Sequence, residues 1–142
     1  MTALSPDRIP VIAGIGEIAD RPKDVAAALE PLALMAEAAR RADDDSRGLL
    51  REVDSLDVIA LVSWRYEDLP AQLSQRLGIS PTRAFYGQVG GESPVRYIHE
   101  AAQRIARGEC SVAAVCGAEA QSTATKAERA KIELPWTPFA HD

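Results

Sequence analysis

The feature that most constrains the fold is a helix pattern enclosed between two strand-like segments in residues 84–120. Residues 84–89 and 111–117 are apolar, as buried strands are, and residues 93–107 between them have helical spacing. Strand, helix and strand in this order predict two parallel strands joined by a right-handed crossover.

The turn that leads into this helix has the composition of a helix entry. Gly90 and Gly91 permit positive φ, the Ser93 hydroxyl is expected to cap the helix, and Pro94 suits its first turn. Free N–H groups and the helix dipole would make Gly90, Gly91, Glu92 and Ser93 a possible site for an anion or a carbonyl oxygen. The alternative is a well-capped helix without a ligand.

The rest of the chain repeats the alternation of strands and helices. Apolar runs predict buried strands over 8–18 and 55–63, and helical patterns cover 25–44, 68–77 and 121–131. The helix over 25–44 is expected to start at Pro31 and to fray at the acidic residues 43–45. The predicted fold class is α/β, with one mostly parallel sheet and helices on both faces.

The predicted organisation is a single domain over residues 1–142 with an irregular tail at 133–142. Such a length suffices to remove about 68% of the unfolded surface from water. The tail has two prolines and several aromatic residues, with no helix or strand pattern to bury them. We therefore expect these aromatic side chains to be exposed and the ending to be that of a truncated chain.

Charge and hydropathy exclude several classes of partner. The net charge of −5, with acidic and basic residues interspersed, offers no basic face for nucleic acid. Residues 1–8 contain no apolar leader, and no apolar run approaches the ~20 residues that span a bilayer. We expect a soluble cytoplasmic protein.

A possible dinucleotide motif lies at Gly14-Ile15-Gly16-Glu17-Ile18-Ala19. In nucleotide-binding proteins a helix begins within this motif, whereas here Asp20-Arg21-Pro22 interrupts it. We prefer the interpretation that these are glycines at the end of a strand.

Residues that often carry chemistry are few and isolated. Cys110 and Cys116 would lie about 20 Å apart along one strand, too far to form a disulfide, and they have no neighbours at metal-ligand spacing. We expect no metal and no cofactor. His99 has no partner at triad-like spacing, so a structural or interface role is preferred. Residues 64–67, Trp-Arg-Tyr-Glu, are compatible with the lip of a pocket or with a subunit contact.

The segment from Gly90 to Gly117-Ala118-Glu119 resembles the thiolase superfamily, in the order of a thiolase N-terminal half. The resemblance covers nearly the whole chain. It is strongest to the branch labelled acetyl-CoA acetyltransferase, near the sterol carrier protein-type thiolases, in which Gly-Gly-x-Ser-Pro can replace the cysteine motif. In the family a nucleophilic cysteine starts the helix, and Gly91 stands at its position here. Catalytic residues are therefore absent from this segment, and the resemblance assigns Glu119 to the support of neighbouring backbone.

Neither nearby candidate replaces the missing nucleophile. Cys116 is predicted to be buried among apolar residues, where thiols are generally inert. Ser93 is expected to be occupied as a cap, with no histidine nearby in sequence to activate it.

The resemblance also implies partners. It implies acyl-CoA as the ligand of a full-length protein, a C-terminal half that supplies the acid/base histidine and a second cysteine, and a homodimer formed through Ala84 to Val89. It places the helix at 92–107 between two sheets, which agrees with apolar residues on more than one of its stripes.

Two functions remain open. One is the N-terminal half of an acyl-CoA-handling enzyme of lipid metabolism, an acyltransferase or carbon–carbon lyase without an acyl-cysteine, which is inactive alone. The other is a noncatalytic thiolase-fold module that binds CoA esters or assembles subunits.

Overall fold

The computed structural model describes residues 5–142 and shows a three-stranded parallel sheet covered by helices. Residues 1–4, which belong to the segment 1–8 predicted to contain no apolar leader, lie outside the described residues. The strands are β1 (Ser55–Val58), β2 (Arg83–Tyr86) and β3 (Ala113–Cys116), in the order β2-β1-β3. The helices are α1 (Pro31–Ser46), α2 (Leu69–Leu77), α3 (Ser93–Ala106) and α4 (Gln121–Ala130). Short 3₁₀ turns lie at η1 (Pro6–Arg8), η2 (Val25–Ala27) and η3 (Leu50–Glu52).

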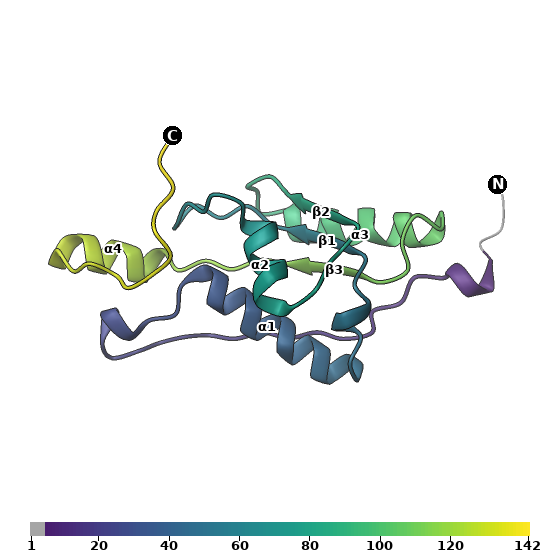
Figure 1. Ribbon diagram of the computed structural model, residues 1–142, viewed down its shortest axis with the longest axis horizontal. Coiled ribbons are helices and arrows are strands. Elements are labelled where there is room, and N and C mark those ends of the chain that lie inside the picture. Colours follow the sequence, from purple (N-terminus) through teal and green to yellow (C-terminus); the bar gives the residue numbers. More distant parts are fainter. Residues whose placement is uncertain (1–4) are drawn as a thin grey trace.

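The sheet confirms the predicted α/β class with parallel pairing. In its register Leu56 lies beside Ala84 of β2 and Ala114 of β3, so β1 is the central strand. Helices α1 and α2 lie on one face of the sheet and α3 on the other (Figure 1). All three strands run toward the end of the molecule that carries α4, so the loops after β1 and β2 emerge there (Figure 1).

The two faces of β1 differ in chemistry because side chains alternate along a strand. Leu56 and Val58 belong to the apolar core, together with the inward residues Leu32, Met35, Ala36, Leu61, Leu69 and Leu73. Ser55 and Asp57 are also fully buried, but they contact polar side chains. One face of the sheet is therefore an ordinary core and the other is polar.

Helix α1 begins at Pro31, as predicted, and continues through the acidic residues 43–45 to Ser46. The expected fraying is wrong, because these carboxylates bind backbone N–H groups beyond the helix. Asp43 accepts from Leu50 N at 2.9 Å and Asp45 from Ile15 N at 2.8 Å. Their local bonds outweigh the unfavourable dipole.

The predicted limits of the other helices are nearly those observed. The Asp68 side chain caps α2 by accepting from Ala71 N, and Gly78 ends it in the left-handed conformation with φ of 68°. Gly108, with φ of 75°, follows the end of α3. These helices end where the sequence places a residue that tolerates positive φ.

The strand predicted over residues 8–18 is wrong. Residues 9–18 are extended but pair with no strand, and Val11 and Ile12 are 77% and 78% exposed. Their backbone is held by α1 side chains: Arg41 donates to Glu17 O at 2.8 Å, and Asp45 binds Ile15 as above. Helix contacts have thus taken the place of a strand ladder.

Gly14 and Gly16 explain why this segment lies so close to α1. A Cβ on Gly16 would fall 2.2 Å from Ala38 O, and one on Gly14 would fall 2.5 Å from Ala42 O. Both obstacles are backbone atoms, which cannot move aside. The two glycines therefore allow the segment to pack closely on α1. The prediction that they end a strand is wrong, because this segment is not a strand.

Several strands are shorter than predicted, and the tail is better packed. The run from Ile59 to Val62 leaves the sheet after β1, although Ile59 N still donates to Cys116 O at 2.8 Å. Residues 133–142 contain no helix or strand, but Trp136 is buried, so its expected exposure is wrong. In the described part of the chain, no helix is long and apolar enough to cross a membrane.

Candidate functional site at the start of helix α3

The turn before α3 contains every residue predicted to bind a ligand. Gly90, Gly91 and Glu92 connect the end of the β2 segment to Ser93, the first helical residue. The Ser93 N–H donates to Gly90 O at 3.1 Å, which closes a tight turn. Among the bonds of residues 5–142, neither the Gly91 nor the Glu92 amide has an acceptor.

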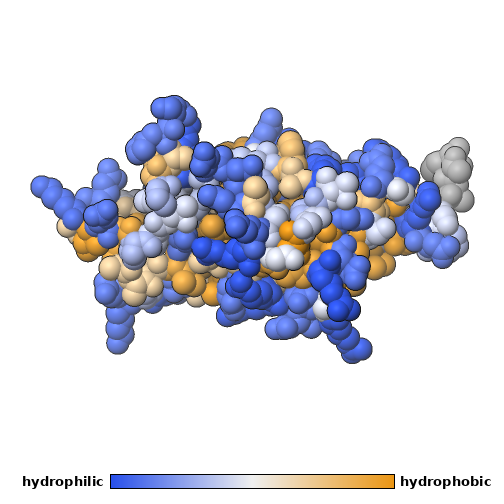
Figure 2. Space-filling view, in the orientation of Figure 1, coloured by the Kyte–Doolittle hydropathy of each residue, from blue (hydrophilic) through white to orange (hydrophobic). Residues whose placement is uncertain are grey.

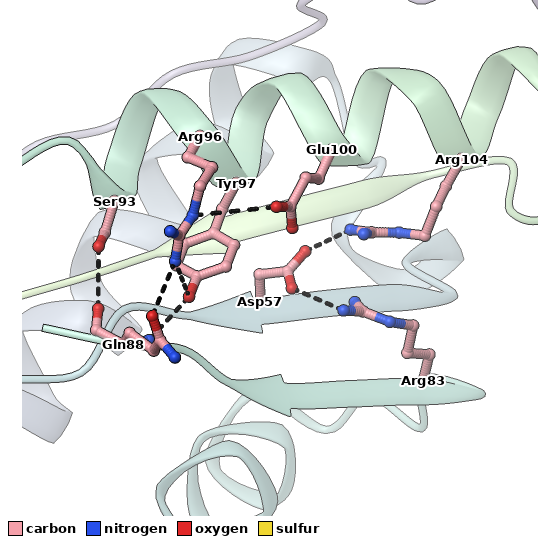
Figure 3. Close-up of polar contacts among 8 residues, drawn as sticks. All are labelled: Asp57, Arg83, Gln88, Ser93, Arg96, Tyr97, Glu100 and Arg104. Atoms are coloured by element: carbon pink, nitrogen blue, oxygen red, sulfur yellow. Dashed lines mark hydrogen bonds and ion pairs between the residues drawn. The ribbon is translucent and has the colours of Figure 1, made fainter. Parts of the chain in front are cut away.

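Ser93 does not have its predicted role. It is fully buried, and its hydroxyl donates to Gln88 O at 2.9 Å (Figure 3). Glu92 stands at the N-cap position without a side-chain capping bond. The serine therefore ties the helix start back to the chain before the turn and leaves the first-turn amides uncapped.

The two glycines of the turn have different surroundings. Neither has positive φ, so the expected conformational reason for them is wrong. A Cβ on Gly90 would lie 2.7 Å from a carboxylate oxygen of Glu92, whereas one on Gly91 would meet no atom within 4 Å. Position 91 is thus open and unstrained.

Tyr97 anchors the start of α3 to residues 87 and 88 of the preceding chain. Its ring lies against Gly87, where an added Cβ would come within 2.5 Å of a ring carbon. Its hydroxyl accepts from Gln88 N at 2.7 Å and from Arg96 at 3.1 Å. The hydrogen bond to Tyr97 raises the pKa of Arg96 above its ordinary value, so this residue stays cationic. A positive side chain therefore lies on the first turn of the helix.

A buried ion cluster fixes the other end of α3 to the sheet. The Asp57 carboxylate is fully buried and binds Arg83 of β2 at 3.0 Å and Arg104 of α3 through its second oxygen (Figure 3). Arg83 also donates to Ser55 Oγ at 3.2 Å. These polar residues link β1, β2 and α3, the elements that position the turn.

Sequence reasoning missed Asp57, Arg83, Tyr97 and Arg104. The available signal is Asp57 itself, an acid in the middle of an otherwise apolar strand. A buried carboxylate requires a cation, but the sequence does not say which of the 16 Lys and Arg residues supplies it.

Other candidates lie apart from the turn. His99 is exposed on α3. Cys116 is only partly buried against the apolar core, so its predicted full burial is wrong. Desolvation nevertheless raises its pKa to about 11, so the thiol is neutral at pH 7 and a poor nucleophile. Among residues 5–142 no three His, Cys, Asp or Glu side chains gather as metal ligands would.

Glu119 supports neighbouring backbone, as the resemblance implied. Its carboxylate accepts from Val62 N at 2.6 Å and from Ser63 N at 3.1 Å. The Ser63 hydroxyl accepts from Ala120 N at 3.0 Å. These bonds join the start of the loop after β1 to the end of the β3 segment.

The fold is similar to solved structures of thiolase-superfamily proteins. An SCP2-thiolase-like protein type 1 from Mycobacterium smegmatis superposes with a TM-score of 0.68 and 28% identity over 82% of this chain and 24% of that chain. OleA from Xanthomonas campestris, as a Glu-to-Gln variant bound with cerulenin, gives 0.60 and 24% over 71% of this chain and 32% of that one.

A Cys-to-Ser variant of OleA with bound lauric acid and lauroyl-CoA gives a TM-score of 0.53 and 22% identity over 63% of this chain and 27% of that one. No protein-family model and no curated protein matches the sequence.

The chain has a thiolase-like α/β fold. This confirms the predicted resemblance to the thiolase superfamily. The chain spans about a quarter of the SCP2-thiolase-like protein and about a third of OleA.

Proposed function

We propose that this chain is the N-terminal half of a thiolase-like, acyl-CoA-handling protein of acyltransferase or carbon–carbon lyase type that forms no acyl-cysteine. The observation that carries the proposal is an open glycine, Gly91, at the start of α3 in a thiolase-like fold. Thiol chemistry has no atom to use there, while the helix start and its free amides remain.

The chemistry offered by the turn is the binding of a negative or partly negative oxygen. The Gly91 and Glu92 amides lie at the positive end of the α3 dipole, and Arg96 is on the first helical turn. We assign the substrate contact to Gly90, Gly91, Glu92 and Ser93. Because the Ser93 hydroxyl is engaged with Gln88, its contribution is to the shape of the turn.

The partners we propose are acyl-CoA, a C-terminal thiolase half and a second copy bound through Ala84 to Val89, in the cytoplasm and in lipid metabolism. Support for the dimer is that β2 is an edge strand with Phe85 and Tyr86 partly exposed. Support for acyl-CoA is its presence in the OleA complex with lauroyl-CoA. We expect residues 1–142 alone to be inactive, since the family's histidine and second cysteine are not among them.

The test uses a complete protein with both halves and lauroyl-CoA as the probe. Gly91→Trp should abolish release of free CoA, because the indole fills the open space above the turn. Gln103→Trp, at an exposed site on the same helix, should preserve it. Release is followed with a thiol reagent, and circular dichroism checks that both variants fold.

Three other outcomes decide against the proposed enzyme. Absence of both turnover and lauroyl-CoA binding in the unmodified protein contradicts any role with this ester. Binding without turnover favours the alternative, a noncatalytic module for CoA esters or subunit assembly. Equal turnover in Gly91→Trp and Gln103→Trp places the site elsewhere.

A further inference from the structure

Residues 136–142, which we call the strap, are seated against two distant parts of the chain. The Trp136 indole N–H donates to Ala28 O at 2.9 Å, and the Trp64 indole N–H donates to Thr137 O at 2.9 Å. The two rings meet edge to face with centroids 5.0 Å apart, and Phe139 packs against Trp64 at 5.3 Å. Reciprocal bonds of this kind specify one position for the strap.

Glu30 joins the strap to two other segments, α2 and the loop after β1. Its side chain is only 11% exposed and lies 3.7 Å from the Arg76 guanidinium of α2. The carboxylate accepts from Thr137 N at 3.3 Å and Thr137 Oγ1 at 3.1 Å. It also accepts from the Tyr66 hydroxyl at 2.8 Å. A sheltered carboxylate with four partners is a costly group to leave unpaired.

The strap also holds the loop after β1. Residues 64–67, which we call the lip, have no regular secondary structure. Ala140 N donates to Arg65 O at 3.0 Å, and Trp64 and Tyr66 bind the strap and Glu30 as described. Glu119 fixes Val62 and Ser63, and Tyr66 also accepts from Leu32 N of α1 at 3.1 Å. The remaining hydrogen bonds of the lip are made with the strap and Glu30.

The lip borders a cavity at the carboxyl ends of β1 and β2, where parallel sheets commonly place ligands. The cavity measures about 280 Å³ and is lined by Tyr66, Glu67, Asp68, Leu69, Ala84 and Tyr86, among others. Figure 1 shows the yellow chain after α4 turning back and rising past this end of the sheet.

We propose that the strap is a conformational latch: when seated it holds residues 64–67 as one wall of this cavity, and when released it frees them. Five hydrogen bonds and two aromatic contacts seat the strap, but none of its residues belongs to the apolar core cluster of β1, α1 and α2. Release therefore leaves that core intact, and segments outside the core open at lower free energy than the whole domain.

The sequence supplies its own probe, because its only two tryptophans are Trp64 and Trp136. Fluorescence excited selectively from tryptophan, and not from the three tyrosines, therefore reports on the latch alone. In Trp136→Phe the ring is kept and the bond to Ala28 O is lost. We expect a red shift and stronger acrylamide quenching of the remaining Trp64, with both unchanged in Val95→Ala, a control 72% exposed on α3.

Amide hydrogen exchange of the 142-residue chain locates the opening. The amides that report on the lip are those of Leu32, which donates to the Tyr66 hydroxyl, and Ala140, which donates to Arg65 O. Trp136→Phe and Thr137→Val should each speed exchange at these two amides roughly fivefold, as expected for loss of one hydrogen bond. Exchange at Leu56 and Val58 in the central strand should not change.

Unchanged exchange at Leu32 in both variants overturns the proposal, since Tyr66 and the lip would then be held without the strap. Equal acceleration at Leu32 and at the central strand also overturns it, because the strap would then be part of the global fold. Trp136→Ala removes the whole ring and should speed exchange further. If that variant fails to fold, the result for Thr137→Val alone tests the proposal.

Discussion

Asp57 is the residue on which the polar face of the sheet depends. It is fully buried, and its two oxygens are bound by Arg83 and by Arg104, whose side chain is 13% exposed. Burying a charge is unfavourable unless it is paired, so these three residues have to be considered as one unit. The unit joins α3 to β1 and β2, and α3 carries the candidate site.

Removal of the Asp57 carboxylate should strongly destabilise the chain. Asp57→Ala leaves Arg104 without its counterion, and breaking a buried pair in this way costs about 3–5 kcal/mol. Glu37→Ala, which breaks the exposed pair with Arg41, should cost less than about 1 kcal/mol. Urea unfolding of both variants measures the loss in free energy of unfolding. Equal losses would show that the buried cluster stabilises the chain no more than an exposed ion pair does.

At the scale of elements, local signals in the sequence were reliable and long-range ones were not. The start of α1 at Pro31, the Asp68 cap and the glycine after α3 follow from backbone chemistry within a few residues. The 8–18 segment has strand-like composition, but a strand requires a partner, and composition names none. The ligands of Asp57 and the seat of Trp136 depend likewise on residues 26 or more positions away.

The candidate site shows the same division. Its place between a strand and a helix was predicted, and so was the support that Glu119 gives to backbone. The direction of the Ser93 hydroxyl was not, because Gln88 O offers an acceptor only after the turn has closed. Capping preferences describe isolated helix ends, and tertiary bonds override them.

Two glycines next to helices should respond oppositely to alanine. A Cβ on Gly16 would fall 2.2 Å from Ala38 O in α1, so Gly16→Ala forces the segment off the helix and should cost about 1–3 kcal/mol. Gly91 has open space and no positive φ, so Gly91→Ala should change stability by no more than about 0.5 kcal/mol. Thermal unfolding of the pair checks this, and a large loss in Gly91→Ala would mean that the turn is strained.

At the scale of the molecule, much apolar surface remains uncovered. Figure 2 shows orange apolar patches between charged side chains along the face that it presents. On α3, Val95 and Ile98 are 72% and 49% exposed, although the opposite side of that helix packs its polar residues on the sheet. An apolar stripe on the solvent side of a helix is the pattern of a helix that is covered on two sides.

We therefore expect residues 1–142 to self-associate when isolated, and the α3 stripe to drive it. The double variant Val95→Asp with Ile98→Asp should shift the chain toward the monomer in light scattering after size-exclusion chromatography, because each aspartate would have to be desolvated at the contact.

Val89→Asp, beside the edge strand β2, separates the two surfaces: it should act only on a dimer formed through residues 84–89. A monomer in the unmodified chain at 100-fold different concentrations, roughly a span of 2.7 kcal/mol in association free energy, would contradict self-association by either surface. If Val89→Asp alone dissociates the assembly, the α3 stripe is left for the C-terminal half, which is the partner that the proposed function requires.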